Sequence, residues 1–270
     1  MAALPHDSMT ATWSIDRHVQ AEYGNEVPVI MPTVSTWDVH FALLGPGPKG
    51  LDLLLATTTD EAREYYEGTR REWSIITSSH LKEVTTPWYS LHDSVGQIRM
   101  KSSGEKVVSR TAILFPAWTD GIIGEIVWGQ PQWAVRDTRP VTEGELEVSV
   151  LHERFVDSWA RGDVDGSLDL IEDETCTVVR IVEVDGPHRT RLVARSKDEL
   201  AKALRSPEAG KVIELERDNL VVTPWYAFGA YRLEVALPDR RVEREIAALY
   251  PVGPNGRFVG QLAYGIEVTI

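Results

Sequence analysis

The sequence contains one cysteine, Cys176, in 270 residues. A single cysteine excludes an internal disulfide and a zinc site built from several thiolates, so we interpret Cys176 as a small buried core residue. Uninterrupted apolar runs are short, and none approaches the roughly 20 residues of a membrane-spanning helix. The first ten residues lack the basic-then-apolar order of a signal peptide, so we expect a cytoplasmic protein.

Positive charge is also scarce. Lysine and arginine number 28 against 41 aspartate and glutamate residues, which gives a formal net charge of −13. Nucleic acids and anionic membranes bind basic surfaces, so we expect neither as a partner. The hydrophobic content of 43% and charged content of 26% are typical of a globular protein.

Several cofactor and catalytic motifs are missing from the sequence. There is no Gly-x-Gly-x-x-Gly, no Gly-Lys-Ser/Thr phosphate loop, no His-Glu-x-x-His and no Gly-x-Ser-x-Gly. We therefore expect no nucleotide, flavin or other cofactor, and no metal. A metal site built from His80, His92 and Asp93 stays open, because no ligand spacing demands or excludes it.

The chain does contain an internal repeat. Thr86-Pro87-Trp88-Tyr89 recurs 137 positions later as Thr223-Pro224-Trp225-Tyr226. The flanking blocks agree in order, with offsets between 138 and 135: Asp60-Glu61 with Asp198-Glu199, Leu114-Phe115-Pro116 with Leu249-Tyr250-Pro251, and Gly124-Glu125 with Gly260-Gln261. The period is too long for a solenoid. The sequence therefore predicts a tandem duplication of one domain.

The domain boundary is predicted in the polar segment 136–144, which contains Pro140 and Gly144. This divides the chain into residues 1–138 and 139–270. In each half, helices are followed by a strand, a further helix and a meander of long strands, which predicts the α+β class. Important predictions for the first half are a strand over Val34–Leu44, a loop over Gly45–Gly50, and a helix from Asp60 to about Trp73 with Thr59 as its cap.

This order resembles the cone-shaped α+β superfamily of nuclear transport factor two, ketosteroid isomerase, scytalone dehydratase and the SnoaL-like cyclases. The residues that carry the resemblance in the second copy are the opening helix Leu151–Asp163 and the short helix Leu168–Ile171. In the first copy they are the strands Arg110–Pro116 and Asp120–Glu125. The Pro-rich segment Val27–Pro32 departs from the family pattern.

The resemblance implies a curved antiparallel sheet that wraps around helices and leaves an apolar pocket in each domain, with the two domains forming an internal pseudo-dimer. Members with enzymatic activity are generally cofactor-free. They move protons on a hydrophobic small molecule with a His or carboxylate base and with Tyr, His or Asp donors. Desolvation in such a pocket tunes carboxyl groups for this chemistry.

Two pairs are the candidate catalytic residues. Asp38 and His40 lie two apart on the expected strand and therefore share a face. Facing inward they form an acid/base pair, and facing outward they lie in solvent. Thr177 and Val179 are expected at the corresponding places of the second copy. His92 and Asp93 are the second pair, of which only one can face the pocket, because adjacent strand residues alternate.

The candidate substrate-binding residues are Tyr23, His80, Trp88, Tyr89 and Arg110. The tyrosines and Trp88 can donate hydrogen bonds or form the pocket wall, although the repeat of Trp88-Tyr89 also suits core packing. Arg110 is a candidate ligand for an anion or carbonyl, or an exposed strand residue. His6 and His18 are predicted to lie on the surface.

The two copies differ in chemistry, because the first contains five of the seven histidines. We expect a catalytic first domain and a degenerate second domain. The reverse assignment, with Tyr226, Tyr231 and Glu234 in the working pocket, stays open.

Two functions fit these observations. One is a cofactor-independent lyase or isomerase of aromatic compound metabolism, which acts on an aromatic or polycyclic molecule by dehydration, retro-aldol cleavage, double-bond shift or cyclisation. The other is a non-catalytic module that binds a hydrophobic ligand or a protein. Assembly into a homo-oligomer is left open.

Overall fold

The computed structural model describes residues 8–47, 50–184 and 186–270. The chain forms two compact units, one of residues up to 46 and 52–130, the other of residues 47–51 and 131–270. The sequence placed the division later, after residue 138. Each unit has its own sheet and helices, so the chain is an α+β protein of two tandem domains.

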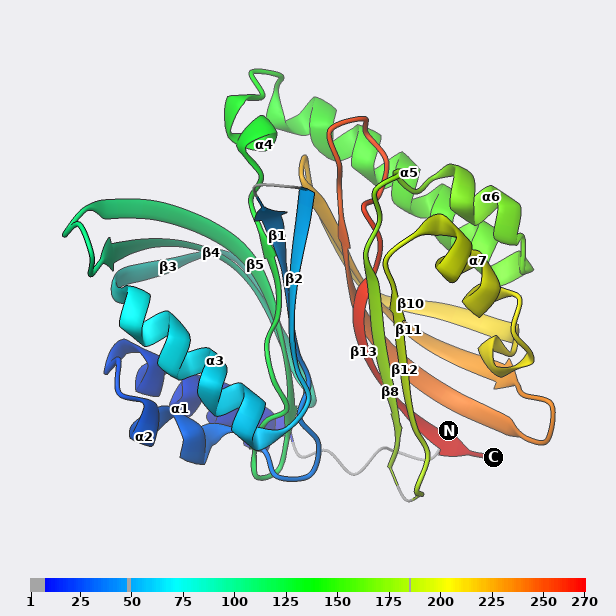
Figure 1. The fold of residues 1–270 in the computed structure, drawn as a ribbon. Coiled ribbons are helices and arrows are strands. Elements are labelled where there is room, and N and C mark those ends of the chain that lie inside the picture. The colour runs from blue at the N-terminus through cyan, green and yellow to red at the C-terminus, as the bar shows by residue number, and fades with distance from the viewer. Residues whose placement is uncertain (1–7, 48–49, 185) are drawn as a thin grey trace. The chain divides into compact units, whose positions relative to one another are not determined.

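The first domain is built around one curved sheet. Its elements are α1 (Ser8–Tyr23), α2 (Val27–Ile30), the 3-10 turn η1 (Met31–Thr33), β1 (Phe41–Gly47), β2 (Gly50–Ala56), α3 (Thr59–Glu72), β3 (Trp73–Thr85), β4 (Tyr89–Met100), β5 (Lys106–Trp118), β6 (Gly121–Ile122) and β7 (Ile126–Gly129). The strand order is β2-β1-β7-β5-β4-β3, with β6 paired to β5. Strands β1 and β7 are parallel, whereas β7–β5, β5–β4 and β4–β3 are antiparallel. Figure 1 shows β3, β4 and β5 curving over α1 and α3.

Helix α3 begins and ends as the sequence predicts to within a residue or two. The hydroxyl of Thr58, one residue before the predicted cap, accepts a hydrogen bond from the Glu61 amide, and the Glu61 carboxylate accepts one from the Thr57 amide. Acids in its first turn and arginines in its last complement the helix dipole. This helix brings Tyr65, Tyr66 and Arg70 under the sheet.

The second domain repeats this arrangement. Its elements are α4 (Gln132–Arg136), α5 (Val141–Arg161), α6 (Val164–Asp169), β8 (Thr177–Glu183), β9 (Arg189–Ala194), α7 (Lys197–Leu204), η2 (Pro207–Ala209), β10 (Lys211–Thr223), β11 (Tyr226–Ala236), β12 (Arg241–Pro251) and β13 (Leu262–Thr269). The strand order β9-β8-β13-β12-β11-β10 matches the order of the first sheet strand for strand, and β8 and β13 are again parallel. The shared topology supports the duplication.

Two glycines mark equivalent points of the copies. A Cβ at Gly124 would lie 2.1 Å from the carbonyl oxygen of His40, and a Cβ at Gly260 would lie 2.1 Å from that of Cys176. Both positions need glycine because the backbones approach so closely. His40 therefore corresponds to Cys176, and the expected correspondence with Val179 is wrong.

The repeated Thr-Pro-Trp-Tyr has a structural role in both domains. The hydroxyl of Thr86 donates to the Tyr89 carbonyl and that of Thr223 to the Tyr226 carbonyl, which closes the same turn twice. The rings of Trp88 and Tyr89 lie 4.8 Å apart, as do those of Trp225 and Tyr226. The motif is therefore a turn with a buried aromatic pair.

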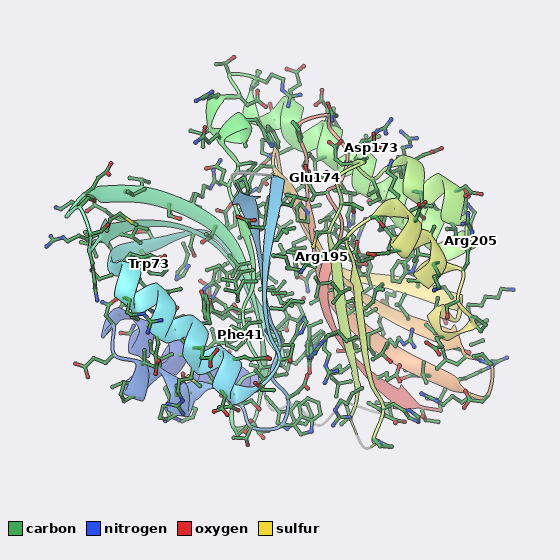
Figure 2. The ribbon with its side chains drawn as sticks, viewed as in Figure 1. Phe41, Trp73, Asp173, Glu174, Arg195 and Arg205 are labelled. Atoms are coloured by element: carbon green, nitrogen blue, oxygen red, sulfur yellow. The ribbon has the colours of Figure 1, made fainter. Side chains whose placement is uncertain are left out.

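The predicted strand over Val34–Leu44 is wrong at its N-terminal part. Strand β1 begins only at Phe41, which Figure 2 labels. The segment before it is held by Asp120, whose carboxylate accepts hydrogen bonds from the Ser35 hydroxyl at 2.6 Å and the Thr36 amide at 2.8 Å. The predicted loop over Gly45–Gly50 is too long, since β1 continues to Gly47 and β2 begins at Gly50.

Each domain has its own apolar core. The first includes Phe41, Tyr66 and Phe115, and the second includes Phe155, Tyr250 and Phe258. Over the described residues, every helix is too short or too polar to cross a membrane.

Candidate functional site

The first domain contains a pocket between helices α1 and α3 and the sheet that curves over them. Its volume is about 290 Å³, at the small end of the range for ligand sites. The walls are mainly apolar and aromatic, with Val19, Leu43, Trp73, Ile75, Ile113 and Phe115 among the lining residues. The pocket therefore suits a compact, largely apolar molecule.

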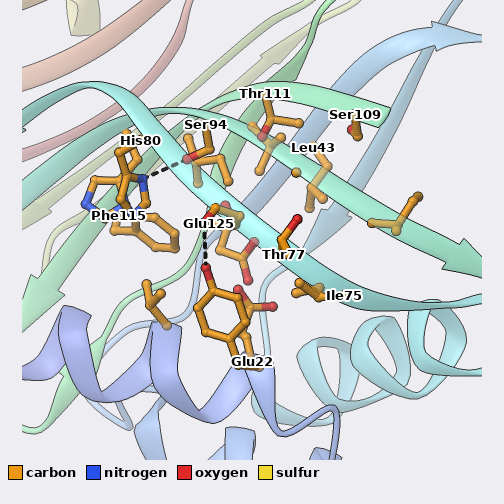
Figure 3. A pocket seen from close by; sticks show the side chains of 18 of the residues that line it. Glu22, Leu43, Ile75, Thr77, His80, Ser94, Ser109, Thr111, Phe115 and Glu125 are labelled. Carbon is orange, nitrogen blue, oxygen red and sulfur yellow. Dashed lines mark hydrogen bonds between the residues drawn. The ribbon is translucent and has the colours of Figure 1, made fainter. Parts of the chain in front are cut away.

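Two carboxylates face this pocket. Glu22 comes from the last turn of α1 and Glu125 from the residue before β7. Figure 3 shows them approaching one another, and one oxygen of each lies within 4.8 Å of the other and of a His18 ring nitrogen. Burial, and then the charge of Glu125, raise the pKa of Glu22 to about 7, although His18 and Arg70 oppose the rise. Glu22 therefore exchanges a proton readily near neutral pH.

Arg70 fixes the position of Glu22. Its Nη2 donates to the Glu22 carboxylate at 2.8 Å, while its guanidinium packs over the Trp73 ring at 5.0 Å. The Arg70 side chain is only 5% exposed, whereas that of Glu22 is 16% exposed. Arg70 thus holds the Glu22 carboxylate in place, and Glu22 remains accessible from the pocket.

A buried polar cluster lies behind Glu125. The His18 Nδ1 lies 2.7 Å from the Thr33 hydroxyl, which donates to the Ile30 carbonyl at 2.6 Å. The His18 Nε2 lies 3.1 Å from the Tyr66 hydroxyl and 3.5 Å from a Glu125 oxygen. Tyr66 donates to the same Glu125 oxygen. His18 is fully buried, so its predicted surface position is wrong; His6 lies outside the described residues.

Tyr65 offers the site a hydrogen-bond donor that is available to a ligand. It lines the pocket, and its hydroxyl has no hydrogen-bond partner within the described parts of the chain. Burial, and then the charges of Glu125 and Glu22, raise the pKa of Tyr65 well above its usual value. The phenol therefore stays protonated and can donate to an oxygen of a ligand.

His80 and His92 lie on the strand wall of the pocket. The His80 Nδ1 lies 3.0 Å from the Ser94 hydroxyl, and the two imidazole rings are 4.2 Å apart. Burial, and then the neighbouring His80, lower the pKa of His92 to about 4. His92 is therefore neutral at pH 7.

Three of the residues predicted from the sequence line this pocket: Tyr23, His80 and His92. The Tyr23 hydroxyl donates to the Ser78 carbonyl at 3.3 Å. Asp38 and His40 do not line it. They precede β1, and the buried His40 is held through its amide, which donates to the Ile123 carbonyl at 3.0 Å. The structure does not bring them together as a pair on a strand.

The other predicted residues lie away from the pocket. Asp93 is fully buried and forms a two-pronged ion pair with Arg110, with N–O distances of 3.0 and 2.8 Å. The pair lies on the other face of the sheet, because the neighbours His92 and Ser94 face the pocket. Trp88 and Tyr89 are buried in the repeated turn and do not line the pocket either.

Sequence reasoning missed Glu22, Glu125 and Tyr65. Two signals in the sequence pointed to the two glutamates. Ser14, Ile15, His18, Ala21 and Glu22 recur at helical spacing on the inner face of α1. Glu125 interrupts the apolar run Ile122–Val127, where a charge is not expected unless it is paired.

The same cluster contains atoms of the ligand type, but we assign no metal ligands there, because Arg70 already binds Glu22. His18, Glu22 and Glu125 offer ligand atoms within 4.8 Å of one another. The Arg70 guanidinium, 2.8 Å from Glu22, would compete with such a cation. The alternative set of His80, His92 and Asp93 does not converge, because Asp93 faces away from the two histidines.

The second domain has apolar residues and one glutamine at the positions of this polar site. Four pairs of matching features define equivalent positions in the two domains. They are the burial patterns of α1 and α5, the helix caps Thr58 and Ser196, the glycines Gly124 and Gly260, and the bridges Val34–Ile122 and Ile171–Phe258. By these matches, His18, Glu22, Thr33, Tyr66 and Glu125 correspond to Phe155, Trp159, Leu170, Leu204 and Gln261. The equivalent pocket, lined by Phe155, Trp159, Leu204 and Gln261 among others, has a volume of about 30 Å³.

Among known proteins, no family model and no curated protein matches the chain. Solved structures do match, each over about half of it. A putative isomerase from Rhodopseudomonas palustris is 9% identical with a TM-score of 0.40, covering 46% of this chain and 93% of that one. A ketosteroid isomerase-like protein from Erwinia carotovora atroseptica is 16% identical with a TM-score of 0.35, covering 47% and 98%. An NTF2-like protein from Burkholderia xenovorans is 9% identical with a TM-score of 0.38, covering 50% and 99%.

These likenesses concern the fold and leave the activity open. The duplication itself is seen in the two sheets, which have the same strand order. The chain is a tandem pair of α+β domains that resemble the NTF2-like and ketosteroid isomerase-like proteins in fold.

Proposed function

We propose that the first domain is a cofactor-independent isomerase or lyase that moves a proton on a small, uncharged and mainly apolar molecule. The observation that carries this proposal is the pair Glu22 and Glu125 at the base of an apolar pocket, with the pKa of Glu22 at about 7. A carboxylate with such a pKa is half-ionised at neutral pH, which is the best condition for general acid–base catalysis.

Each group has a role in this chemistry. Glu22 removes a proton from a carbon next to a carbonyl and returns it at another position. Tyr65 donates a hydrogen bond to the oxygen on which negative charge develops, and Arg70 holds Glu22 in place. Double-bond shift, dehydration and cyclisation can begin with removal of such a carbon-bound proton, whereas retro-aldol cleavage begins when the same base removes a hydroxyl proton.

The pocket favours an uncharged substrate. Among the described residues that line it, acids are present but lysine and arginine are absent. An anionic group would meet the Glu22 and Glu125 carboxylates, and the nearby Arg70 is already paired with Glu22. With a formal net charge of −13, the chain is also a poor partner for nucleic acid or an anionic membrane.

The second domain serves as a structural partner in this proposal. Phe155, Trp159 and Leu204 occupy the places of the polar residues, and its pocket holds about 30 Å³. The alternative function, a non-catalytic module that binds an apolar ligand, is favoured by the apolar walls of the first pocket and needs no ionisable Glu22.

Hydrogen exchange on a ketone distinguishes the two functions without knowledge of the natural substrate. The uncharged bicyclic ketone 2-tetralone is incubated with the protein in deuterium oxide, and loss of its α-hydrogens is followed by NMR. We expect the wild type to accelerate exchange, and Glu22→Gln to slow it by about a hundredfold or more. The control Glu67→Gln changes an exposed carboxylate on α3 and should keep the wild-type rate. Binding of the ketone without enzyme-dependent exchange would favour the binding module.

A further inference from the structure

The hydrogen bonds around His18 determine which of its ring nitrogens carries a proton. The Thr33 hydroxyl has one hydrogen, and at 2.6 Å from the Ile30 carbonyl oxygen that hydrogen is donated there. The His18 Nδ1, 2.7 Å from the same hydroxyl oxygen, must therefore be the donor in their contact. Neutral His18 is thus protonated on Nδ1, with the lone pair of Nε2 directed at Tyr66 and Glu125.

The His18 Nε2 lone pair lies close to the Tyr66 and Glu125 oxygens, which also accept hydrogen bonds. Protons must therefore lie between these three atoms. The Nε2 lies 3.1 Å from the Tyr66 oxygen and 3.5 Å from a Glu125 oxygen. Tyr66 has a single hydrogen to share between the imidazole and the carboxylate. With neutral His18 and ionised Glu125, two lone pairs would face one another in a buried site, which is costly. One further proton satisfies the cluster.

Two arrangements of these protons are possible. In the first, the carboxylic acid of Glu125 donates to the Tyr66 oxygen, and the Tyr66 hydroxyl donates to Nε2. In the second, the Tyr66 hydroxyl donates to the Glu125 carboxylate, and the His18 imidazolium carries a proton on Nε2. Passing from the first to the second moves one proton from Glu125 to the Tyr66 oxygen and one from Tyr66 to His18. The number of protons and all heavy-atom bonds are unchanged.

We propose that Thr33, His18 and Tyr66 form a buried proton relay that ends at Glu125, so that Glu125 faces the pocket either as a carboxylate or as a carboxylic acid. Glu125 is then a second acid/base group beside Glu22. His18, Thr33 and Tyr66 are positioning residues that act through it, since none of them lines the pocket. The catalytic use of the Glu125 proton rests on the proposed function.

The duplicated domain supports a functional reading of the relay. Its equivalents of Thr33, His18, Tyr66 and Glu125 are Leu170, Phe155, Leu204 and Gln261, on strands and helices of the same topology. The fold therefore does not need the cluster. Burying the Glu125 carboxylate, where the second domain has the uncharged Gln261, is a cost that a purely structural site avoids.

The relay also narrows the reaction class. A carboxylate oxygen of Glu22 and one of Glu125 lie within 4.8 Å of one another, and both residues face the pocket. An acid and a base this close act on the same side of a small molecule. The relay therefore favours reactions in which one group removes a carbon-bound proton while its neighbour protonates an oxygen, such as loss of water from a hydroxy ketone.

NMR of the full-length protein tests the relay without any substrate. The ring nitrogens of His18 and the carboxyl carbon of Glu125 are followed in labelled protein from about pH 5 to about pH 9. His18→Gln and Glu125→Gln assign the signals. Glu22, Tyr65 and Arg70 are the other titratable or charged groups that face the cluster, so Glu22→Gln is measured in parallel.

We expect Nδ1 of His18 to stay protonated throughout, and Nε2 and the Glu125 carbon to change with one common midpoint. Tyr66→Phe should separate the two midpoints. Thr33→Val should populate both His18 tautomers, and Thr33→Ser should restore the wild-type pattern. The matched control Thr69→Val removes a hydroxyl that donates to the backbone of Tyr66 outside the relay and should change nothing.

Two results would overturn the relay. One is a neutral His18 protonated on Nε2 in the wild type, and the other is separate midpoints for Nε2 and Glu125. If Thr33→Val does not fold, the wild-type midpoints and Thr33→Ser still decide the question. Because activity is not measured, failure of the relay is distinct from failure of the proposed reaction.

Discussion

Tyr65 is the side chain whose environment says most about the substrate. Its phenol faces the pocket, with no hydrogen-bond partner among the described residues, and its pKa lies well above the usual value because of burial and two nearby carboxylates. A group in this state donates a hydrogen bond and does not ionise. The natural acceptor is the oxygen of a bound carbonyl compound.

Removing this hydroxyl should affect turnover more than stability. We expect Tyr65→Phe to slow α-hydrogen exchange on 2-tetralone by roughly a hundredfold, the usual effect of losing one oxyanion donor. The midpoint of thermal unfolding should stay close to that of the wild type, because the hydroxyl has no partner to lose among residues 8–47, 50–184 and 186–270. An unchanged exchange rate would show that the substrate oxygen lies elsewhere.

The environment of His152 leads to a prediction about how the unfolding free energy depends on pH. This histidine is buried in the second domain with its Nε2 2.5 Å from the Tyr231 hydroxyl, and burial lowers its pKa to about 4. The unfolded chain therefore binds a proton at higher pH than the folded chain does. The stability contribution is complete above about pH 6.5 and is lost as the pH falls toward 4.

The size of this effect follows from the shift in pKa. Each pKa unit corresponds to about 1.4 kcal/mol, so His152 should contribute on the order of 3 kcal/mol of pH-dependent stability. We expect the loss of unfolding free energy between pH 7 and pH 4.5, measured with urea, to be smaller in His152→Gln. His92 has a similarly lowered pKa and keeps its own contribution in that variant. The control His188→Gln alters an exposed histidine; if its pH dependence fell as much, burial would not be the cause.

At the level of elements, helix α3 and its counterpart α7 form a matched pair. Thr58 caps α3 and Ser196 caps α7, each accepting a hydrogen bond of 3.2 Å from an amide in the first turn. Thr58→Ala and Ser196→Ala should each cost about 1 kcal/mol of unfolding free energy. Only α3 carries Tyr65, Tyr66 and Arg70, so only Thr58→Ala should slow ketone exchange. Equal loss of exchange in both variants would mean that activity depends on general stability.

Element types could be predicted from the sequence where local chemistry decides them. The cap and charge pattern of α3 is a local signal, and the structure has this helix close to the expected position. A meander of long strands was also expected, and β3–β5 form one. Asp38-Val39-His40 shows strand-like alternation, yet it lies outside the strand. Asp120, more than 80 residues later in the chain, holds Ser35 and Thr36 in an irregular segment. Alternation alone does not report such a contact.

Site residues were harder to predict because a pocket is assembled from distant segments. Histidine content pointed to the first domain, and His80, His92 and Tyr23 do line its pocket. The carboxylates were missed because the helical stripe of α1 and the charge within Ile122–Val127 do not show that Glu125 lies beside Glu22. The burial of Glu22 depends on Arg70 and on Glu125, which comes from the far end of the domain. Local patterns do not contain that information.

For the whole molecule, the duplication supplies an internal control. Two domains with the same strand order differ at the same set of positions, where one has carboxylates, an imidazole and a phenol and the other has apolar side chains and a glutamine. Because the second domain keeps the same strand order without these polar residues, the topology does not depend on them. The apolar version buries no charge and should be the more stable site.

The pH dependence of ketone exchange tests the central claim, that Glu22 is the proton-transfer group, most directly. The rate constant for loss of the α-hydrogens of 2-tetralone is measured across the pH range for the wild type and Glu22→Gln. Because the ionised carboxylate is the base, the rate should rise with pH through a midpoint near 7, the pKa of Glu22 in the free protein. The rise should be absent in Glu22→Gln. A rate that does not change between about pH 5 and about pH 8, or a midpoint that persists in Glu22→Gln, would contradict the account.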